Sequence, residues 1–290
     1  MKSLVVGLGI GNLYVDVLRA RGAEVVTVDG NPAKDAHYLS VAEAMNDHAD
    51  FDTINICTPN FTHKIIYEFW HAKNTKPNAV AFIEKPGFAN ADEWQSITGR
   101  KMMVKNNQYR NNIGDMIEQA RSANNISLRW INNDRVPSPG SWFTDSSKSF
   151  GGVSRDLLPH LLSYLPVFFP DRYCNTSVNQ RQLHFRWKLE DLVQTDYGTV
   201  NANGIYNVED RAYLELNLGD KHIELTADWR SLQGDDIGIY FDGIKIELGL
   251  CPEDAYASMI ESAISGDEEF WRNQLEQDIW LHNMMDFKLN

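Results

Sequence analysis

The sequence predicts an α/β protein: a doubly wound parallel sheet, followed by an α+β domain with an open-faced mixed sheet that is largely antiparallel. The first third alternates short β-branched apolar runs with helical stretches, which is typical of βαβ units. From about residue 112, Asn-, Ser- and Asp-rich connections separate strands with period-two alternation, which indicates a half-exposed antiparallel sheet. Because 290 residues exceed one usual domain, we expect domains over residues 1–112 and 113–290.

The first domain should alternate strands with helices. Its apolar runs predict strands at residues 4–6, 24–29, 53–57, 80–84 and 102–105. Helical stretches between them are expected at residues 13–21 and 63–72.

In the second part of the chain, a Ser-, Gly- and Asp-rich loop at residues 137–152 is followed by an apolar segment at 157–169. Alternating apolar residues predict three strands, around Leu214, Leu216 and Leu218, around Ile223 and Leu225, and around Ile244, Ile246 and Leu248. A final helix is expected near residues 268–287. Its apolar face should consist of four residues at helical spacing: Trp271, Leu275, Ile279 and His282.

Composition excludes several classes of function. Forty acidic against 27 basic residues give a net charge of −13, which repels phosphate backbones and anionic lipid surfaces, so we expect neither a nucleic-acid nor a membrane partner. No run approaches the roughly 20 apolar residues of a bilayer-spanning helix, and the first residues are interpreted as a strand rather than a signal peptide. Cys57, Cys174 and Cys251 lie far apart and favour neither a disulfide framework nor a zinc site, so we expect a cytoplasmic protein without metal.

A glycine-rich turn, Gly7-Leu8-Gly9-Ile10-Gly11, lies between the first strand and the first helix. Glycines at this place let the backbone approach a pyrophosphate, and the helix N-terminus supplies a favourable dipole. The third glycine of G-x-G-x-x-G would be residue 12, which is Asn12. Either Gly11 serves in a shorter turn or the helix packs less closely, and a tight turn without a ligand is a third interpretation.

Asp29 ends the second strand, twenty residues after Gly9. An acidic side chain there accepts hydrogen bonds from the adenosine ribose hydroxyls and repels a 2′-phosphate. We therefore favour NAD over NADP as the cofactor, although a solvated strand-end aspartate would look the same.

Two more motifs follow parallel strands. Thr58-Pro59-Asn60, with His63 after it, follows one strand, and Glu84-Lys85-Pro86 follows the next. The carboxyl ends of parallel strands are where open α/β sheets bind ligands. A residue before proline is held extended, so Lys85 can be presented from a defined backbone, although a loop lysine is usually only solvated.

Asp156 and His160 are four residues apart and face the same way if their segment is helical. Proline is tolerated only in the first helical turn, so Pro159 predicts a helix that starts near Asp156 and leaves both side chains at its mouth. The pair also suits a metal, but no third ligand is evident nearby. A histidine flanked by leucines can equally be a core residue.

In combination, these motifs resemble the glucose-fructose oxidoreductase, inositol dehydrogenase and rhizopine catabolism (GFO/IDH/MOCA) oxidoreductases. The resemblance spans nearly the whole chain and uses the motifs above together with Gln108-Tyr109-Arg110, Trp142 and Gly151-Gly152. It implies a Rossmann domain and an open-faced sheet that binds substrate and joins subunits, here as a homodimer or homotetramer.

The resemblance also implies residue roles. Lys85 and His160 would be catalytic, Asp156 would hold substrate hydroxyls, and the Thr58-Pro59-Asn60 turn and Glu84 would line the cofactor. We also expect Asn12 and His63, which belong to the glycine turn and the Thr58 turn, among the cofactor contacts. Departures from the family pattern are Asn12 in the glycine turn, Leu158 where glycine is usual, and Ser163 where aspartate is common.

The function that we expect is reversible oxidation of a secondary alcohol on a sugar, polyol or related small molecule, with hydride passing to NAD. A histidine with an ordinary pKa of roughly 6.5 suits proton transfer near neutrality, so His160 is the candidate base. Lys85 would stabilise alkoxide character, and Asp156 would orient the imidazole or a substrate hydroxyl. Trp142 would be a wall near the nicotinamide or a packing residue, and Arg110 would meet an anionic substrate group or form a surface ion pair.

Two other functions remain open at this point. One is an inactive dinucleotide sensor or co-regulator of the same fold, which the altered glycine turn favours. The other is a reductase of bilin-type substrates, as in tetrapyrrole-reducing relatives.

Overall fold

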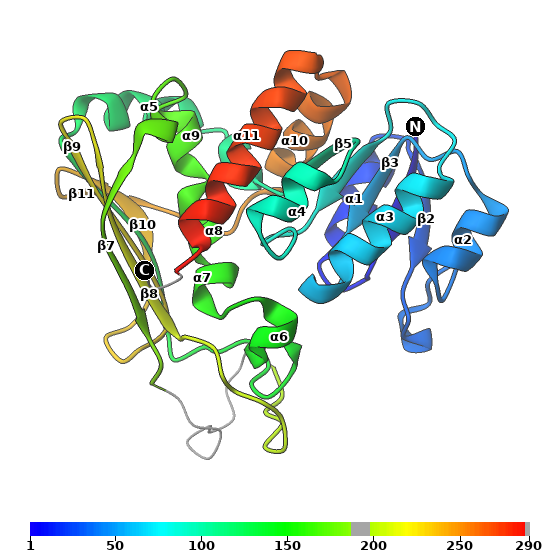
Figure 1. Ribbon diagram of the computed structural model, residues 1–290, viewed down its shortest axis with the longest axis horizontal. Helices are drawn as coiled ribbons and strands as arrows, with labels where there is room; N and C mark the ends of the chain where they lie inside the picture. The colour runs from blue at the N-terminus through cyan, green and yellow to red at the C-terminus, as the bar shows by residue number, and fades with distance from the viewer. Residues whose placement is uncertain (187–197, 288–290) are drawn as a thin grey trace. The chain divides into compact units, whose positions relative to one another are not determined.

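The computed structural model describes residues 1–186 and 198–287, which form two compact units (Figure 1). Unit 1 contains Met1–Tyr109 and Pro252–Ile279, and unit 2 contains Arg110–Cys251 and Trp280–Asn290. Segment 252–279, which we expected in the second domain, belongs to unit 1 because its first helix packs against the first helix of the chain, with the Tyr14 and Tyr256 rings 5.4 Å apart. The domain boundary after residue 112 stays a prediction.

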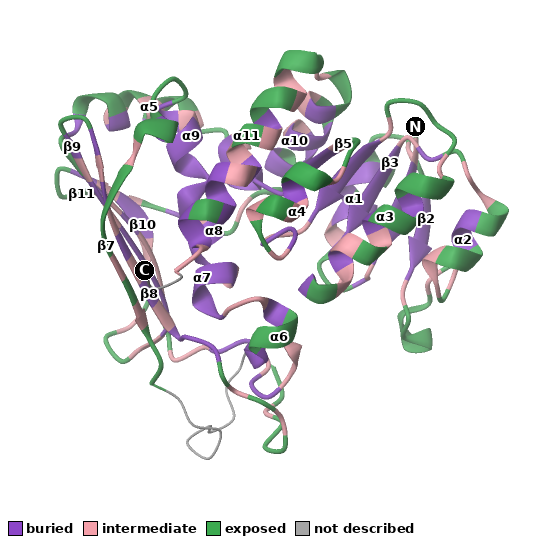
Figure 2. Ribbon diagram, viewed as in Figure 1, coloured by how far each residue is buried: buried purple, intermediate pink, exposed green. Residues whose placement is uncertain are grey.

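Unit 1 is built on a parallel five-stranded sheet in the order β2-β1-β3-β4-β5, which confirms the predicted doubly wound, Rossmann-like fold. The strands are β1 Lys2–Val6, β2 Glu24–Val28, β3 Thr53–Ile56, β4 Val80–Ile83 and β5 Arg100–Met103. They are buried almost throughout, as Figure 2 shows, which explains why they read as continuous apolar runs. Strand order reverses between β1 and β3, and open sheets bind their ligands at that point.

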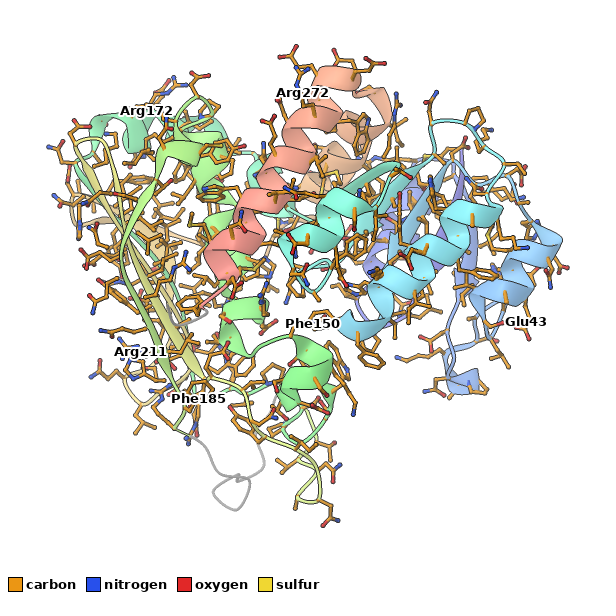
Figure 3. The ribbon with its side chains drawn as sticks, in the orientation of Figure 1. Glu43, Phe150, Arg172, Phe185, Arg211 and Arg272 are labelled. Atoms are coloured by element: carbon orange, nitrogen blue, oxygen red, sulfur yellow. The ribbon has the colours of Figure 1, made fainter. Side chains whose placement is uncertain are left out.

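The helices of unit 1 include three that we did not expect: α2, α4 and α10. The helices are α1 Gly11–Ala20, α2 Val41–Asp47, α3 His63–Lys73, α4 Ala91–Ser96 and α10 Glu253–Ser265, with 3₁₀ turns η1 Pro32–Lys34, η2 Asn60–Thr62 and η3 Asn106–Tyr109. Helix α2 starts at a capping box, in which Ser40 and Glu43 (labelled in Figure 3) each accept the other's backbone N–H.

Unit 2 contains a six-stranded mixed sheet in the order β11-β10-β6-β9-β8-β7, in which only β6 and β9 pair in parallel. This confirms the mixed, largely antiparallel sheet. The strands are β6 Asn125–Asn133, β7 Ser177–His184, β8 Arg211–Leu218, β9 Lys221–Ser231, β10 Asp236–Phe241 and β11 Ile244–Glu247.

One face of this sheet is covered by short helices, α7 and α8, which contact β6, β8 and β9. The helices of unit 2 are α5 Ile113–Ser122, α6 Ser146–Ser149, α7 Val153–Asp156, α8 Leu158–Leu162 and α9 Tyr164–Phe168, with η4 Trp142–Thr144 and η5 Tyr173–Asn175. Leu214, Leu216 and Leu225 are completely buried, as their alternation predicts. The intervening residues of β8 and β9 are polar, with the Tyr213 hydroxyl donating to Glu224, so subunit association through the open face stays a prediction.

Two predicted elements of the C-terminal part are present, but their buried residues differ from the expected ones. Strand β11 is an edge strand, and Ile244 is 71% exposed while Leu248 lies beyond the strand end. In the last helix, α11 Glu268–Met285, His282 is buried as predicted, whereas Trp271, Leu275 and Ile279 are only half-buried. The other buried positions include Gln274, Asp278 and Leu281. Asp278 lies inside because it pairs with the buried Lys105.

Candidate functional site

The three glycines of the turn between β1 and α1 have different surroundings and different roles. Gly7 adopts a φ of +91°, and a Cβ there would lie 2.6 Å from the carbonyl oxygen of Cys57. A Cβ on Gly11 would lie 3.1 Å from Cγ1 of Val5, so Gly11 lets α1 pack closely on the sheet. A Cβ on Gly9 would meet nothing within 4 Å. Gly11 therefore performs the packing role of the third glycine in a turn one residue shorter.

The side chains of two predicted cofactor residues, Asp29 and Asn12, form hydrogen bonds with the backbone of this turn. Oδ2 of Asp29 accepts the Leu8 N–H at 2.7 Å, and Nδ2 of Asn12 donates to the Leu8 carbonyl oxygen at 2.9 Å. Both backbone polar groups of Leu8 are thus satisfied by side chains. The other Asp29 oxygen accepts the Asn31 N–H at 2.8 Å, so the carboxylate is fixed at the end of β2.

This turn fits a dinucleotide pyrophosphate. No side chain caps the ten-residue helix α1, whose Asn12 and Leu13 N–H groups contact the carbonyl oxygens of Gly9 and Ile10 at 3.4 and 3.0 Å within the turn itself. The space beside Gly9 leaves room for close approach of a phosphate, and the helix dipole favours its charge. Gly7, Gly9, Gly11 and Asp29 would hold the cofactor.

His63 occupies a different place from the one expected of a cofactor contact. It is completely buried at the start of α3, with Nε2 2.7 Å from the carbonyl oxygen of Thr58 and Nδ1 2.8 Å from that of Gly87. The imidazole therefore lies between the turn after β3 and the turn after β4, and in its neutral form it can donate to only one of the two carbonyl oxygens. Burial lowers the pKa of His63 and the Lys85 charge adds to this, while the two carbonyl groups oppose it.

The Thr58-Pro59-Asn60 turn leads into η2, with the Thr58 and Thr62 hydroxyls 2.6 Å apart. In the turn after β4, Oε1 of Glu84 accepts the Tyr14 hydroxyl at 2.8 Å and Oε2 accepts the Lys85 N–H at 3.2 Å. Burial raises the pKa of the Glu84 carboxyl group, whereas Lys85 and Tyr14 lower it. Glu84 is thus tied to α1 and to the backbone of Lys85.

In unit 2, the buried side chain of Glu209 binds the start of the segment that carries Asp156. Oε1 of Glu209 accepts the N–H groups of Gly152 at 2.8 Å and of Ser154 at 3.0 Å. Just before, the chain turns at Phe150, labelled in Figure 3, which has a φ of +68°. These bonds begin a short helix, α7, at Val153, which the sequence analysis did not expect.

Asp156 instead ends α7, and a second helix, α8, begins at Leu158. Pro159 lies in the first turn of α8, as the rule for proline predicts. His160 follows in the same turn, and its carbonyl oxygen accepts the hydroxyl of Ser163 at 2.8 Å. Asp156 and His160 therefore lie on two consecutive short helices rather than at the mouth of one.

Two tryptophans that the sequence analysis missed contact this pair. The Trp229 indole Nε1 donates to Oδ2 of Asp156 at 2.9 Å, and the Trp130 ring stacks on His160 with centroids 5.1 Å apart. Trp130 pairs with Ala227, two residues before Trp229, so both indoles lie on the face of the sheet that α7 and α8 cover. Period-two spacing in β9 is the sequence signal that could have placed Trp229.

The remaining predicted residues also belong to unit 2. Trp142 lies in η4 and stacks on Phe143 with centroids 3.9 Å apart. Arg110 is 8% exposed and its Nη2 donates to the carbonyl oxygen of Gly249 at 2.7 Å, which favours a packing role over a surface ion pair. Its substrate contact stays a prediction.

The predicted set thus divides between the units. Unit 1 carries the glycine turn, Asp29, the Thr58 turn, His63, Glu84 and Lys85, and unit 2 carries Arg110, Trp142, Asp156 and His160. Across residues 1–186 and 198–287, no group of three or more His, Cys, Asp or Glu side chains could hold a metal ion. Nor does any helix in these ranges have the length and apolar character to cross a membrane.

Comparison with known proteins gives one curated relative and many solved structures, while no family model matches. The relative, from Amycolatopsis mediterranei, is named as a UDP-kanosamine synthase oxidoreductase subunit; it is 25% identical over 268 residues, which cover 82% of this chain and 71% of the relative.

Two solved structures illustrate the fold. The WlbA (WbpB) dehydrogenase of Thermus thermophilus, in complex with NAD and UDP-GlcNAcA, superposes with a TM-score of 0.72 at 16% identity, over 100% of this chain and 96% of that one. A myo-inositol dehydrogenase of Corynebacterium glutamicum superposes with a TM-score of 0.67 at 14% identity, over 97% and 94% of the two chains. The chain therefore has the fold of inositol dehydrogenases and related sugar oxidoreductases, which confirms the resemblance at the level of the fold.

Proposed function

We propose that this protein is an NAD-dependent oxidoreductase of the GFO/IDH/MOCA type. It would transfer hydride between the cofactor and a secondary alcohol or ketone of a sugar, cyclitol or nucleotide-linked sugar. The observation that carries the proposal is the glycine turn at the point of strand reversal, with the Asp29 carboxylate fixed on its backbone. The relative and the solved neighbours, among them NAD complexes, support it.

The nicotinamide would supply the hydride acceptor. His160 would take the proton of the substrate hydroxyl, because an imidazole can exchange protons near neutral pH. Lys85 would stabilise the negative charge that develops on the same oxygen. Asp156 would orient a substrate hydroxyl, since one of its oxygens already accepts the Trp229 N–H and the side chain is thereby held in place.

The choice of NAD over NADP rests on Asp29. Its two oxygens accept the N–H groups of Leu8 and Asn31, so the carboxylate cannot swing away without breaking both bonds. A 2′-phosphate placed beside it would meet a fixed negative charge, whereas ribose hydroxyls could donate to its remaining lone pairs.

The alternative of an inactive sensor loses its main support. That alternative came from the altered glycine turn, but Gly11 takes the packing role of the third glycine and Asn12 closes the turn. No described feature specifically favours a bilin-type reductase.

Cofactor binding is the first test. The purified protein is titrated with NADH and NADPH, following nicotinamide fluorescence and thermal stability, since a ligand that binds the folded state raises the apparent stability. We expect NADH to bind at least tenfold more tightly, and Asp29→Ser to reduce that preference. Failure of both dinucleotides to bind would overturn the proposal.

Turnover is tested with a panel of myo-inositol, monosaccharides and UDP-linked sugars in the presence of NAD. On a substrate so found, Lys85→Ala and His160→Ala should each reduce kcat/KM by about 10²- to 10⁴-fold. Wild-type turnover by both variants would show that the assigned roles are wrong.

A further inference from the structure

Tyr14 connects the glycine-turn helix to the loop that carries Lys85. It lies on α1, three residues after Gly11, and is completely buried. Its hydroxyl donates to Oε1 of Glu84 at 2.8 Å, across 70 residues of sequence. No motif draws attention to this tyrosine, and no role for it follows from the proposed function.

The partner of Tyr14 is bound directly to Lys85. The second oxygen of Glu84 accepts the Lys85 N–H at 3.2 Å, and the Lys85 charge acts on the Glu84 carboxyl group. One carboxyl group thus contacts the Tyr14 hydroxyl on one side and the Lys85 backbone on the other.

The groups that face this carboxyl group decide its charge. Lys85 and the Tyr14 hydroxyl favour the charged carboxylate, and burial favours the neutral acid. Cys57, after β3, interacts with both Glu84 and Tyr14, and Tyr256, on α10, interacts with Tyr14. Burial raises the pKa of Tyr14 and of Cys57, so both stay neutral near pH 7. Loss of the Tyr14 hydroxyl would therefore shift Glu84 toward the neutral acid.

We propose that Tyr14 is a positioning residue for Lys85, and that it acts by holding the Glu84 carboxylate against the Lys85 backbone. The effect on Lys85 is both geometric and electrostatic, because the same carboxylate fixes the loop and stabilises the ammonium. The proposal deepens the proposed function, in which Lys85 acts on the reacting oxygen. It assigns Glu84 to the support of Lys85 rather than to the cofactor.

The test follows Lys85 itself and needs no substrate. The full-length protein is labelled with trace acetic anhydride between pH 7 and 11, and mass spectrometry of the Lys85 peptide gives the midpoint pH of its labelling. Removing the carboxylate with Glu84→Gln should lower that midpoint by about one pH unit, because a nearby opposite charge favours the ammonium. Tyr14→Phe should lower it in the same direction, and the double variant should match Glu84→Gln alone.

Tyr67→Phe is the matched control. Tyr67 is also a completely buried tyrosine of unit 1 and donates at 2.7 Å, but to the carbonyl oxygen of Thr98. Its loss should affect stability and leave Lys85 labelling unchanged. The proposal would be overturned if the midpoint pH of Lys85 labelling were the same in Tyr14→Phe and Tyr67→Phe. It would also be overturned if the shifts of Tyr14→Phe and Glu84→Gln simply added in the double variant. If Tyr14→Phe does not fold, Glu84→Gln alone decides: an unchanged midpoint pH of Lys85 labelling in that variant would also overturn the proposal.

A second readout separates positioning from cofactor binding. Tyr14→Phe should bind NADH within threefold of wild type and lower kcat on an identified substrate by about tenfold. If the wild-type protein binds no dinucleotide, the proposed function fails while the labelling result still decides the role of Tyr14.

Discussion

The Trp229 indole donates its N–H to the Asp156 carboxylate at 2.9 Å and is itself completely buried. A central strand of the unit 2 sheet thereby fixes a residue of α7 that the sequence assigns to substrate. A hydrogen bond to a charged group contributes about 1.5–3 kcal/mol, which is enough to hold one rotamer of Asp156.

Trp229→Phe should therefore lower the free energy of unfolding by about 2–4 kcal/mol, from the lost bond and the lost volume. Trp280→Phe is the control, because Trp280 is a buried residue whose Nε1 has no hydrogen-bond partner within the described ranges. Urea unfolding of the two variants measures the difference. If both lose the same stability, the bond to Asp156 contributes nothing.

Two glycines of the turn should separate cofactor binding from folding. Gly9→Ala adds a methyl group in open space, so unfolding should change by less than about 0.5 kcal/mol while NADH affinity falls at least tenfold. Gly11→Ala places a methyl group 3.1 Å from Val5 and should destabilise the protein by about 1 kcal/mol. NADH titration and thermal unfolding of each variant check the pair. Unchanged affinity in Gly9→Ala would contradict the pyrophosphate site.

The buried ion pair of Lys105 with Asp278 anchors α11 to the end of β5. Both side chains are fully buried, and Oδ2 of Asp278 also accepts the Met103 N–H at 3.0 Å. Lys105→Met should cost about 3–5 kcal/mol, because it leaves a buried carboxylate without its cation. The double variant Lys105→Met with Asp278→Leu should recover most of the lost free energy of unfolding, as measured by urea unfolding. A single variant as stable as wild type would exclude a structural role for the pair.

His63 should make the stability depend on pH. Its pKa in the folded protein lies below the ordinary value of about 6.5, mainly because of burial, so the unfolded chain binds a proton first as the pH falls. Stability from this group is complete above about pH 6.5. It is lost as the pH falls below 6.5 toward the folded pKa, by at most about 1.4 kcal/mol per pH unit.

The measurement is urea unfolding of wild type and His63→Asn between pH 8 and 5. The variant should be less stable at pH 8, because it loses the packing of the buried ring and its hydrogen bond to a carbonyl oxygen of Thr58 or Gly87. It should also lose less stability on acidification. His71→Gln, an exposed histidine on the same helix, should keep the wild-type slope. Equal slopes for wild type and His63→Asn would show that another group titrates.

The parallel sheet could be predicted because its strands are buried on both faces and appear in the sequence as short apolar runs between glycines and polar turns. Helix α2 was missed although its capping box, Ser40 with Glu43, is visible in the sequence. The buried face of α11 could not be found, because Asp278 is buried only by virtue of a lysine 173 residues earlier.

The candidate site likewise contains residues that the sequence identifies and residues that only distant contacts reveal. The glycine turn and Asp29 lie within one βαβ unit, so spacing alone identified them. The supporting residues Tyr14, Trp229 and Glu209 contact their partners across 70, 73 and 57 residues, and no local pattern records such contacts.

The sequence by itself determined where the parallel strands of unit 1 and the glycine turn lie, and which residue types are available for proton transfer and cofactor binding. These properties depend on neighbours within a few residues. Only the tertiary structure decided that Gly11 replaces the third glycine, that His63 and Glu84 hold backbone loops, and that Trp229 orients Asp156. The physical reason is that hydrogen bonds and close packing depend on which distant groups the sheets bring within about 3 Å of each other.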